Sequence, residues 1–566
     1  MVSSQALRRP WRARPPGSAV AITAMVLLVA ALYSTYSLFR FYTFNSSTFD
    51  LVIFDQAIHS YSHFQPGISI VKGLHNGFGP HFSELGDHWS PILASLAPLY
   101  WIHNGPQDLL IAQSVLFALA IPPIWLFTRR ALGGSRKATV AAYLVSGAYA
   151  LSWPIASAVA FDFHEVAFAP VLTAIALERI QAGKIRPALL ALAALLLVKE
   201  DMGLLVAGVG CYLLVSRHQL NRQRLLALCI IAIGLVDTGV ATYVLIPLFG
   251  GRSDYYWAYD ALGRNMPQLA WHVVSHPLRA LRELVTPRIK LETMLWLFGA
   301  FAFLPLLSPI SLAAVPLLLE RMLASSFPNW WGVQFQYNAF IVVILLLAAV
   351  DGGVRLGRWV EWFRARRSAQ AAQAAGGLAA AGVGADLAVA GVSRAGLPAA
   401  GPVSDGPDTP LPAGRATSST ATGPPVRWRT RVSRNVPLGA AALMLALAVI
   451  LIPSFAFDQA LHPAFYKRDA AMDAAAAAVA HVPSGVMVAA AGQLGPQLTA
   501  RDTVVLWDGD GSTPPLLAPW VAANVSQPQF TFKTIAQQKK SVKFLRAHGY
   551  RMVFARDGYI VLHRVT

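Results

Sequence analysis

The sequence predicts a mainly α-helical protein that crosses a membrane many times and ends in a small α/β domain. Of its 566 residues, 55% are hydrophobic and only 13% are charged, whereas roughly a quarter of the residues of a soluble globular protein are charged. A soluble chain of this length would divide into several domains with polar surfaces, because one apolar core stops growing near ~250–300 residues. The composition therefore excludes a soluble enzyme, a disordered chain and a fibrous repeat, and it favours a polytopic membrane protein.

Apolar runs of helical length support this fold class. An arginine-rich arm at residues 1–17 precedes the first run, which begins at residue 18. That run of ~20 apolar residues is long for a signal peptide and no small-residue cleavage site follows it, so we expect an uncleaved helix. Ten further runs bring the expected number of transmembrane helices to about eleven, and they cover residues 107–128, 137–159, 165–182, 187–198, 202–216, 225–248, 291–308, 310–323, 337–351 and 436–454.

The basic residues orient these helices. Clusters of Arg and Lys follow the second, fourth, sixth and tenth runs, so they fall in alternate loops. Because loops rich in Lys and Arg stay in the cytoplasm, the N-terminus is expected there too. The opposite, extracytoplasmic loops are then residues 40–106, 160–164, 199–201, 249–290, 324–336 and everything after residue 455.

The first ten runs make up the predicted membrane domain, residues 18–351. Two regions of different composition follow it, and the first of these, residues 352–435, is rich in Ala, Gly, Pro and Arg. Such a composition cannot bury a core, so we expect a disordered cytoplasmic linker before the last transmembrane helix at 436–454. Residues 455–566 suffice for a small extracytoplasmic α/β domain. Its expected helices are Asp469–Ala480 and Ser541–His548, and its expected strands are Val486–Ala490, Thr503–Trp507, Met552–Ala555 and Tyr559–His563.

The net charge of +18, from 46 basic and 28 acidic residues, does not indicate a nucleic-acid partner. The N-terminal arm contributes four Arg, and residues 352–435 contribute eleven Arg against four acids. Both segments lie on the predicted cytoplasmic side, where anionic lipids attract basic residues. The charge therefore indicates membrane lipid as the partner. The two cysteines, Cys211 and Cys229, have no CxxC partner and are predicted to be buried free thiols.

The first outer loop, residues 40–106, is the most informative segment. It contains Asp50, Asp55, Glu84 and Asp87 and six of the fourteen histidines. A loop of this length between membrane helices is usually functional or disordered, and this one is rich in aromatic residues and poor in linker residues. Asp55 and His59 would share a helix face. We therefore expect an ordered, functional loop.

Two more ionisable clusters are expected on the same side of the membrane. Asp162, His164 and Glu165 lie between the third and fourth runs, and Lys199-Glu200-Asp201 separates the fifth from the sixth. Ionisable groups at membrane depth are costly and point to function. Two structural alternatives stay open: Lys199 could neutralise its neighbours at the tip of a hairpin, and the first cluster could cap a helix at the interface. The aromatic segment Phe327–Tyr337 fits either an interfacial belt or a lining for a lipid-linked ligand.

Metal binding has little motif support. His81, Asp87, His88 and His164 offer oxygen and nitrogen ligands for a divalent cation. No tight spacing such as HExxH accompanies them, and the sequence has no P-loop, GxSxG or GxGxxG before a helix. No metal or cofactor is therefore assigned from the sequence, and a divalent cation stays an alternative.

Several segments together resemble a bacterial membrane family, domain of unknown function 2079. They are FDLVIFDQ at 49–56, HFSELGDHWSPILASLAPLY at 81–100, FDFHE at 161–165, LVKEDMGLLVAGVGCYLL at 197–214, PLLLERMLA at 316–324, FQYNA at 335–339 and the tail segment at 481–507. The resemblance places the protein in a bacterial cell membrane. Two positions depart from the family pattern: Gly495-Pro496-Gln497 stands where a Pro-His pair is expected, and Gln336 stands where His is common.

This family in turn resembles the GT-C glycosyltransferases, which are polytopic enzymes with a catalytic acid in a long first outer loop. The resemblance implies transfer of a hexosyl or pentosyl group from a polyprenyl-phosphate sugar to an acceptor on the outer face. Asp50 would be the base and Asp55 the second choice. Lys199 with Arg252 or Arg264 would hold the phosphate, and Asp162, His164 and Glu165 would bind the acceptor or a cation. The other implied substrate-binding residues are His88, Glu200, Asp201, Trp330, Trp331, Gln336 and Tyr337.

Two other functions remain open at this stage. Charges at helix junctions and short, broken helices also suit a transporter, although alternating access requires neither a large ordered outer loop nor an appended outer domain. A non-catalytic membrane scaffold that presents the C-terminal domain is the second alternative. It predicts that the outer acidic cluster is dispensable.

Overall fold

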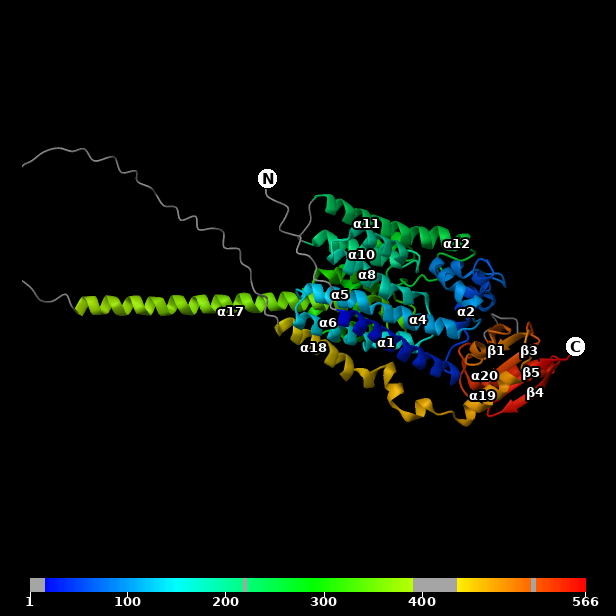
Figure 1. Cartoon of the computed structure of the whole chain (residues 1–566). Coiled ribbons are helices and arrows are strands. Elements are labelled where there is room, and N and C mark those ends of the chain that lie inside the picture. The colour runs from blue at the N-terminus through cyan, green and yellow to red at the C-terminus, as the bar shows by residue number, and fades with distance from the viewer. Residues whose placement is uncertain (1–15, 217–220, 390–434, 510–515, 566) are drawn as a thin grey trace, which may run out of the picture.

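The computed structural model describes residues 16–216, 221–389, 435–509 and 516–565. The predicted N-terminal arm and residues 390–434 of the predicted linker therefore lie outside the described residues, apart from the last two residues of the arm. The helices form one bundle with a small sheet at one end, and helix α17 (Ala339–Val389) projects from the other end (Figure 1). The predicted class, mainly helical with a small C-terminal sheet, is confirmed.

The apolar runs are all helical, but many of them are broken. Helix α4 (Gln107–Leu119) gives way to α5 (Ile121–Ala131) where Pro122 and Pro123 follow. Proline has no N–H to donate and its ring clashes with the preceding turn, so the regular hydrogen bonding is interrupted there. The other helices of the bundle are α1 (Pro16–Tyr42), α6 (Arg136–Ala150), α7 (Trp153–Ala160), α8 (Phe168–Gln181), α9 (Ile185–Leu195), α10 (Met202–Val215), α11 (Asn221–Val240), α12 (Ile246–Leu248), α15 (Arg288–Gly299), α16 (Val315–Leu323) and α18 (Asn435–Ile450).

The breaks reduce the number of helices that could each cross a membrane alone. Within the described ranges, four segments are long and apolar enough: Gly17–Tyr42, Gln107–Ala131, Arg224–Leu248 and Gln336–Ala371. A bent pair, Arg136–Ala150 with Trp153–Ala160, would make five. The predicted count of eleven is not confirmed, because runs such as 187–198 and 310–323 form helices shorter than the ~20 residues that a hydrocarbon core requires.

Helix α17 forms the centre of the bundle. Every residue from Ala339 to Val350 is buried, as expected of a helix that is apolar on all sides. It packs against α5, α8 and α18 and against the short helical turns between Leu304 and Ala314. Beyond the bundle α17 continues to Val389, whereas the sequence analysis predicted disorder from residue 352. Alanine and arginine favour a helix, and Arg355 forms an ion pair with Asp351 one turn earlier, at 2.6 Å.

The predicted hairpin around Lys199 is only partly seen. Helices α9 and α10 flank the charged residues, yet α9 packs mainly on α8 and α10 mainly on α11. Glycines allow the second contact, since a Cβ on Gly203 would come within 2.3 Å of the Gly234 carbonyl oxygen. Cys211 and Cys229 on these helices are free thiols, as predicted, but the prediction that both are buried is wrong: Cys211 is half-buried and Cys229 is exposed, because each lies on a helix face that the bundle does not fully cover.

The outer loops are folded. In the first loop, helices α2 (Asp50–Ser62) and α3 (Ile70–His75) precede a 3-10 helix at Pro91–Trp101. In the loop after α12, α13 (Met266–Ser275) and α14 (Pro277–Val285) lie end to end. The two loops meet at glycines, because a Cβ on Gly251 would lie 1.7 Å from the Gly86 carbonyl oxygen.

A five-stranded mixed sheet forms the C-terminal domain, in the order β2-β1-β3-β5-β4. Four strands match the predicted ones: β1 (Met487–Ala490), β2 (Thr503–Leu506), β4 (Tyr550–Arg556) and β5 (Tyr559–Arg564). The sequence analysis missed β3 (Trp520–Asn524), which pairs in parallel with β1 and antiparallel with β5. Helix α19 (Ala470–Ala480) agrees with its prediction, and α20 (Ile535–Ala547) begins earlier than expected because Thr534 caps the Gln537 N–H.

The C-terminal domain packs against the first outer loop through polar and apolar contacts. The Asp55 carboxylate accepts hydrogen bonds from Thr499 Oγ1 and Tyr100 Oη, both at 2.7 Å. Thr48 accepts the Gly495 N–H at 3.0 Å, and Gln497 Nε2 donates to the Phe41 carbonyl at 2.7 Å. The side chains of α2 also share a hydrophobic cluster with the sheet. The domain is thus fixed to the loop that carries Asp50.

Substituting Gly495 with alanine tests this docking. A Cβ at residue 495 would lie 2.3 Å from Thr48 Oγ1, so we expect Gly495→Ala to separate the domain from α2. Hydrogen–deuterium exchange should then show lost protection in residues 50–62, with protection of the sheet retained. Gly239→Ala is the matched control, since a Cβ there meets nothing within 4 Å. Unchanged exchange in Gly495→Ala would contradict the described docking.

Candidate functional site

Asp50 is the first residue of α2 and lies at the edge of a buried ionisable cluster. Its side chain is 30% exposed, and its Oδ1 lies 3.9 Å from Nε2 of His164. This separation is too long for a direct hydrogen bond, which requires about 3 Å. A water molecule, which has two protons to donate, could bridge the two side chains.

The segment from Phe161 to Glu165 brings the next groups to Asp50. Asp162 Oδ2 accepts the Ser47 N–H at 2.6 Å, which joins this segment to the start of the first outer loop. Burial and, to a smaller extent, the nearby Asp50 carboxylate raise the pKa of Asp162 to about 7, against hydrogen bonds that lower it. Asp162 can therefore hold or release a proton near neutral pH.

His164 is neutral in this environment. Burial lowers its pKa and outweighs the Asp50 and Glu165 carboxylates, which act to raise it. Its Nδ1 lies 3.1 Å from the Asp162 carbonyl oxygen. Because a carbonyl oxygen only accepts, this contact assigns the ring proton to Nδ1. Nε2 then presents its lone pair towards Asp50.

Behind His164, a buried ion pair joins the segment before α8 to the segment before α10. Lys199 Nζ lies 2.8 Å from Glu165 Oε1, and the lysine side chain is 13% exposed. Lys199 thus pairs across the bundle, not with its sequence neighbours as the hairpin alternative supposed. Glu165 Oε2 has no hydrogen-bond partner among the described residues. The pair fixes the start of α8 against the segment that precedes α10.

A second buried pair extends the cluster into the first outer loop. His88 Nδ1 lies 2.9 Å from Glu200 Oε1, and Trp89 N–H donates to the other carboxylate oxygen at 3.2 Å. Burial and Lys199 act to lower the pKa of His88, but Glu200 and Asp87 outweigh them and raise it to about 9. His88 is therefore a cation at neutral pH, with 17% of its side chain exposed.

The loop after α12 covers this second pair. Tyr256 stacks on His88 with ring centroids 4.9 Å apart and donates to Asp87 Oδ1 at 2.8 Å. Asp87 also forms a buried ion pair with Lys72 at 2.8 Å. The sequence analysis did not select Lys72 or Tyr256, since neither lies in a charged motif.

A buried arginine, Arg321, fixes the backbone of the aromatic segment Phe327–Tyr337. Arg321 donates to the Trp330 carbonyl at 2.6 and 3.0 Å and to the Tyr337 carbonyl at 2.7 Å. Trp331 is buried over Lys290, whereas Trp330 is partly exposed and stacks on Phe327. Gln336 is buried, and its Oε1 has no hydrogen-bond partner in the described part of the chain. The sequence signal for Arg321 was a charge inside the apolar run 310–323.

Other predicted residues lie apart from Asp50. Asp55 is buried, and both of its oxygens accept hydrogen bonds that hold the C-terminal domain and the 3-10 helix against α2. Arg252 is 66% exposed and pairs with Asp254 on the surface. His81 is also exposed. Among the described residues, no three His, Cys, Asp or Glu side chains are grouped to hold a metal ion, so the four candidate ligands do not form one site.

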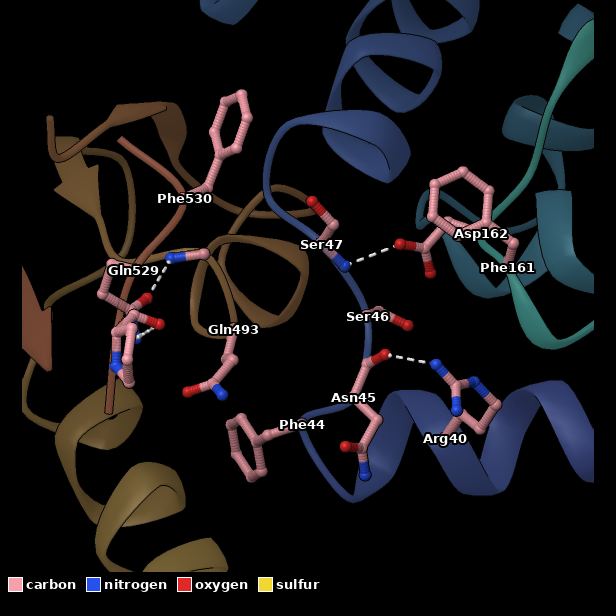
Figure 2. A pocket seen from close by; sticks show the side chains of 12 residues that line it. Arg40, Phe44, Asn45, Ser46, Ser47, Phe161, Asp162, Gln493, Gln529 and Phe530 are labelled. Carbon is pink, nitrogen blue, oxygen red and sulfur yellow. Dashed lines mark hydrogen bonds between the residues drawn. The ribbon is translucent and has the colours of Figure 1, made fainter. Parts of the chain in front are cut away.

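A cavity of about 270 Å³ lies beside Asp162, between the membrane domain and the C-terminal domain. Figure 2 shows the end of α1 and the first residues of the outer loop on one side and the C-terminal domain on the other. The lining residues are Arg40, Phe44, Asn45, Ser46, Ser47, Phe161, Asp162, Gly492, Gln493, Pro528, Gln529 and Phe530.

The family model of DUF2079, whose description is "predicted membrane protein", matches residues 40–374. The chain belongs to this DUF2079 family. No curated protein matches it at a significant level. The DUF2079 match contains every ionisable residue of the cluster from Asp50 to Glu200. The residues that the C-terminal domain contributes, such as Thr499 and Gln493, lie beyond the match.

The Lys199–Glu165 pair can be tested by unpairing it. Removing one partner of a buried ion pair leaves an uncompensated charge and costs about 3–5 kcal/mol. We therefore expect Lys199→Met to lower the thermal midpoint of the detergent-solubilised protein sharply, and Lys199→Met with Glu165→Gln to recover much of the loss. A double variant no more stable than the single one would contradict the pairing.

The His88–Glu200 pair predicts a dependence of stability on pH. The folded pKa of about 9 lies above the ordinary value of 6.5, so the stabilisation is complete below pH 6.5 and is lost as the pH rises through 9. This difference is worth about 3 kcal/mol at most. Raising the pH from 6.5 to 9 should lower the thermal unfolding midpoint of the wild type more than that of His88→Gln. Parallel curves would show that the pair does not form.

Proposed function

We propose that this DUF2079 protein is a GT-C-like glycosyltransferase of the bacterial cell membrane. It would transfer a sugar from a polyprenyl phosphate to an acceptor hydroxyl on the outer face. The observation that carries the proposal is the position of Asp50. Asp50 is a partly exposed carboxylate at the edge of a buried ionisable cluster. The unprotonated Nε2 of the neutral His164 ring faces it at 3.9 Å.

The chemistry follows from this arrangement. The acceptor oxygen would form a bond to the anomeric carbon, while the bond from that carbon to the phosphate oxygen breaks and the electron pair leaves on the polyprenyl phosphate. A phosphate leaving group needs little acid assistance, whereas the acceptor hydroxyl must lose its proton as the new bond forms. Asp50 would take that proton, and His164 Nε2 would accept a hydrogen bond from a second hydroxyl of the acceptor. Direct displacement inverts the anomeric centre.

The cluster also supplies positive charge for the phosphate. Lys199 and His88 are cationic side chains of the cluster that keep some exposure, 13% and 17% respectively. They suit the leaving phosphate better than Arg252, which lies on the surface paired with Asp254. The partly exposed Trp330 and Phe327, stacked on each other, would contact the lipid or sugar.

The orientation is part of the proposal. The arginines of α17 and the C-terminal domain lie at opposite ends of the bundle (Figure 1). If basic residues stay in the cytoplasm, the C-terminal domain and Asp50 face the outside, as transfer from a lipid-linked sugar on that face requires. The eleven apolar segments would then cross or enter the membrane.

Asp50→Asn tests the proposed base. The variant keeps the shape of the side chain but cannot accept the proton, so the rate of transfer should fall by roughly 10²–10⁴-fold. The assay is transfer of labelled hexose or pentose from polyprenyl-phosphate sugars by the full chain in proteoliposomes. Asp254→Asn, which changes an exposed carboxylate in another outer loop, is the matched control.

Three outcomes would contradict the proposal in different ways. Full activity of Asp50→Asn would remove Asp50 from the role of base. Solute flux through proteoliposomes without sugar transfer would favour the transporter. Neither transfer nor flux from any donor would favour the scaffold, for which the ionisable cluster only stabilises the fold.

A further inference from the structure

The cavity beside Asp162 is built from two parts of the chain that are far apart in sequence. The end of α1 and the outer loop provide Arg40 and residues 44–47, and the segment before α8 provides Phe161 and Asp162. The C-terminal domain provides Gln493, Gln529 and Phe530, among others. Figure 2 shows side chains from both sides facing the space between them. A ligand in this cavity would contact the membrane domain and the C-terminal domain together.

The polar lining favours an uncharged ligand with many hydroxyl groups. Its only ionisable side chains among the lining residues are Arg40 and Asp162, one basic and one acidic. The remaining polar groups are amides and hydroxyls, which both donate and accept hydrogen bonds. A phosphate or a carboxylate ligand would need an excess of donors and positive charge, which this lining does not offer.

Several polar groups of the lining are already fixed. Gln493 accepts from Asn524 Nδ2 at 3.0 Å and donates to Gln527 Oε1 at 2.9 Å. Gln529 Oε1 accepts the Gly492 N–H at 2.9 Å. Fixed side chains lose little conformational entropy when a ligand binds. The C-terminal wall is therefore preorganised.

Aromatic rings provide the apolar part of the lining. Phe530 is 66% exposed although it lies in a domain with a well-formed core, and it stacks on Phe49 with centroids 5.3 Å apart. Phe161 stacks on His164 with centroids 5.1 Å apart. Exposed aromatic rings beside amides and hydroxyls suit a molecule with one apolar face and a polar rim, such as a sugar ring.

The size of the cavity limits the ligand. About 270 Å³ corresponds to the volume of roughly nine water molecules at ~30 Å³ each. It lies just below the ~300–1,000 Å³ of sites for drug-sized molecules. One monosaccharide ring fits this space, whereas a longer saccharide would have to extend out of it.

We propose that this cavity binds a sugar ring of the acceptor, and that the C-terminal domain forms one wall of the site. The identification of the ring as the acceptor rests on the proposed function. Ser47 lines the cavity, and its carbonyl oxygen accepts the Leu51 N–H in the first turn of α2, next to Asp50. Asp50 and His164 do not themselves line the cavity, but a ring held here would contact Ser47, which leads into α2, and Phe161, which stacks on His164.

Saturation-transfer difference NMR tests binding without any transfer reaction. The probes are methyl glycosides of hexopyranoses and pentofuranoses, titrated at millimolar concentration against the full chain in nanodiscs. We expect at least one glycoside to bind, with affinity reduced roughly tenfold in Phe530→Ala because an aromatic wall is removed. Phe530→Tyr, which keeps an aromatic ring, should bind the glycoside with the affinity of the wild type. Phe64→Ala, at an 89% exposed aromatic residue of the same outer loop outside the lining, is the matched control.

The outcomes separate this inference from the proposed function. Binding that is unaffected by Phe530→Ala, or the absence of binding by every glycoside, would overturn the cavity site, even if transfer still depends on Asp50. Saturable binding of inorganic phosphate that Phe530→Ala weakens would overturn the assignment to a neutral sugar. Glycoside binding that persists in Asp50→Asn while no donor supports transfer would leave the sugar site standing and refute the transferase.

Discussion

The ion pair between Lys199 and Glu165 is the interaction on which the candidate site depends. A buried lysine or glutamate is tolerated only with a partner, and these two residues belong to different segments of the bundle, one before α10 and the other before α8. Once they pair, the adjacent residues are placed as well. His164 precedes Glu165 and faces Asp50, and Glu200 follows Lys199 and binds His88. One pairing thus brings together the outer loop and both helix junctions.

The membrane class and the grouping of the ionisable residues could be predicted from sequence. The apolar runs and the alternating basic loops predict that Asp50, Asp162 and Lys199 lie on the same side of the membrane. Residues confined to one end of a helix bundle are expected to lie close together. The finer pattern could not be predicted. Proline positions break the runs into shorter helices, and β3 is a five-residue strand containing two alanines that shows no alternation. Asp55 and Asp50 have the same side-chain chemistry, and the sequence does not show that Asp55 is buried against Thr499 and Tyr100 while Asp50 stays partly exposed.

Arg252 and Arg321 show where reasoning from residue type fails. Arg252 has the charge suited to a phosphate, but its ion pair with Asp254 forms on the surface. Arg321 has no carboxylate within ion-pair distance among the described residues and instead holds backbone carbonyls of the aromatic segment. Membership in DUF2079 covers the ionisable cluster, whereas the C-terminal wall of the cavity lies outside the matched residues.

The hydrogen bond between Asp55 and Thr499 joins residues 444 positions apart. During synthesis, α2 emerges long before the C-terminal domain. Until that domain has been made, an aspartate, a glutamine and several apolar side chains of the outer loop lack their final contacts. The loop reaches its described form only after the C-terminal domain has been synthesised and has packed against it. Assembly of the site is thus coupled to complete biogenesis, and a chain that stalls before that point carries an unfinished centre.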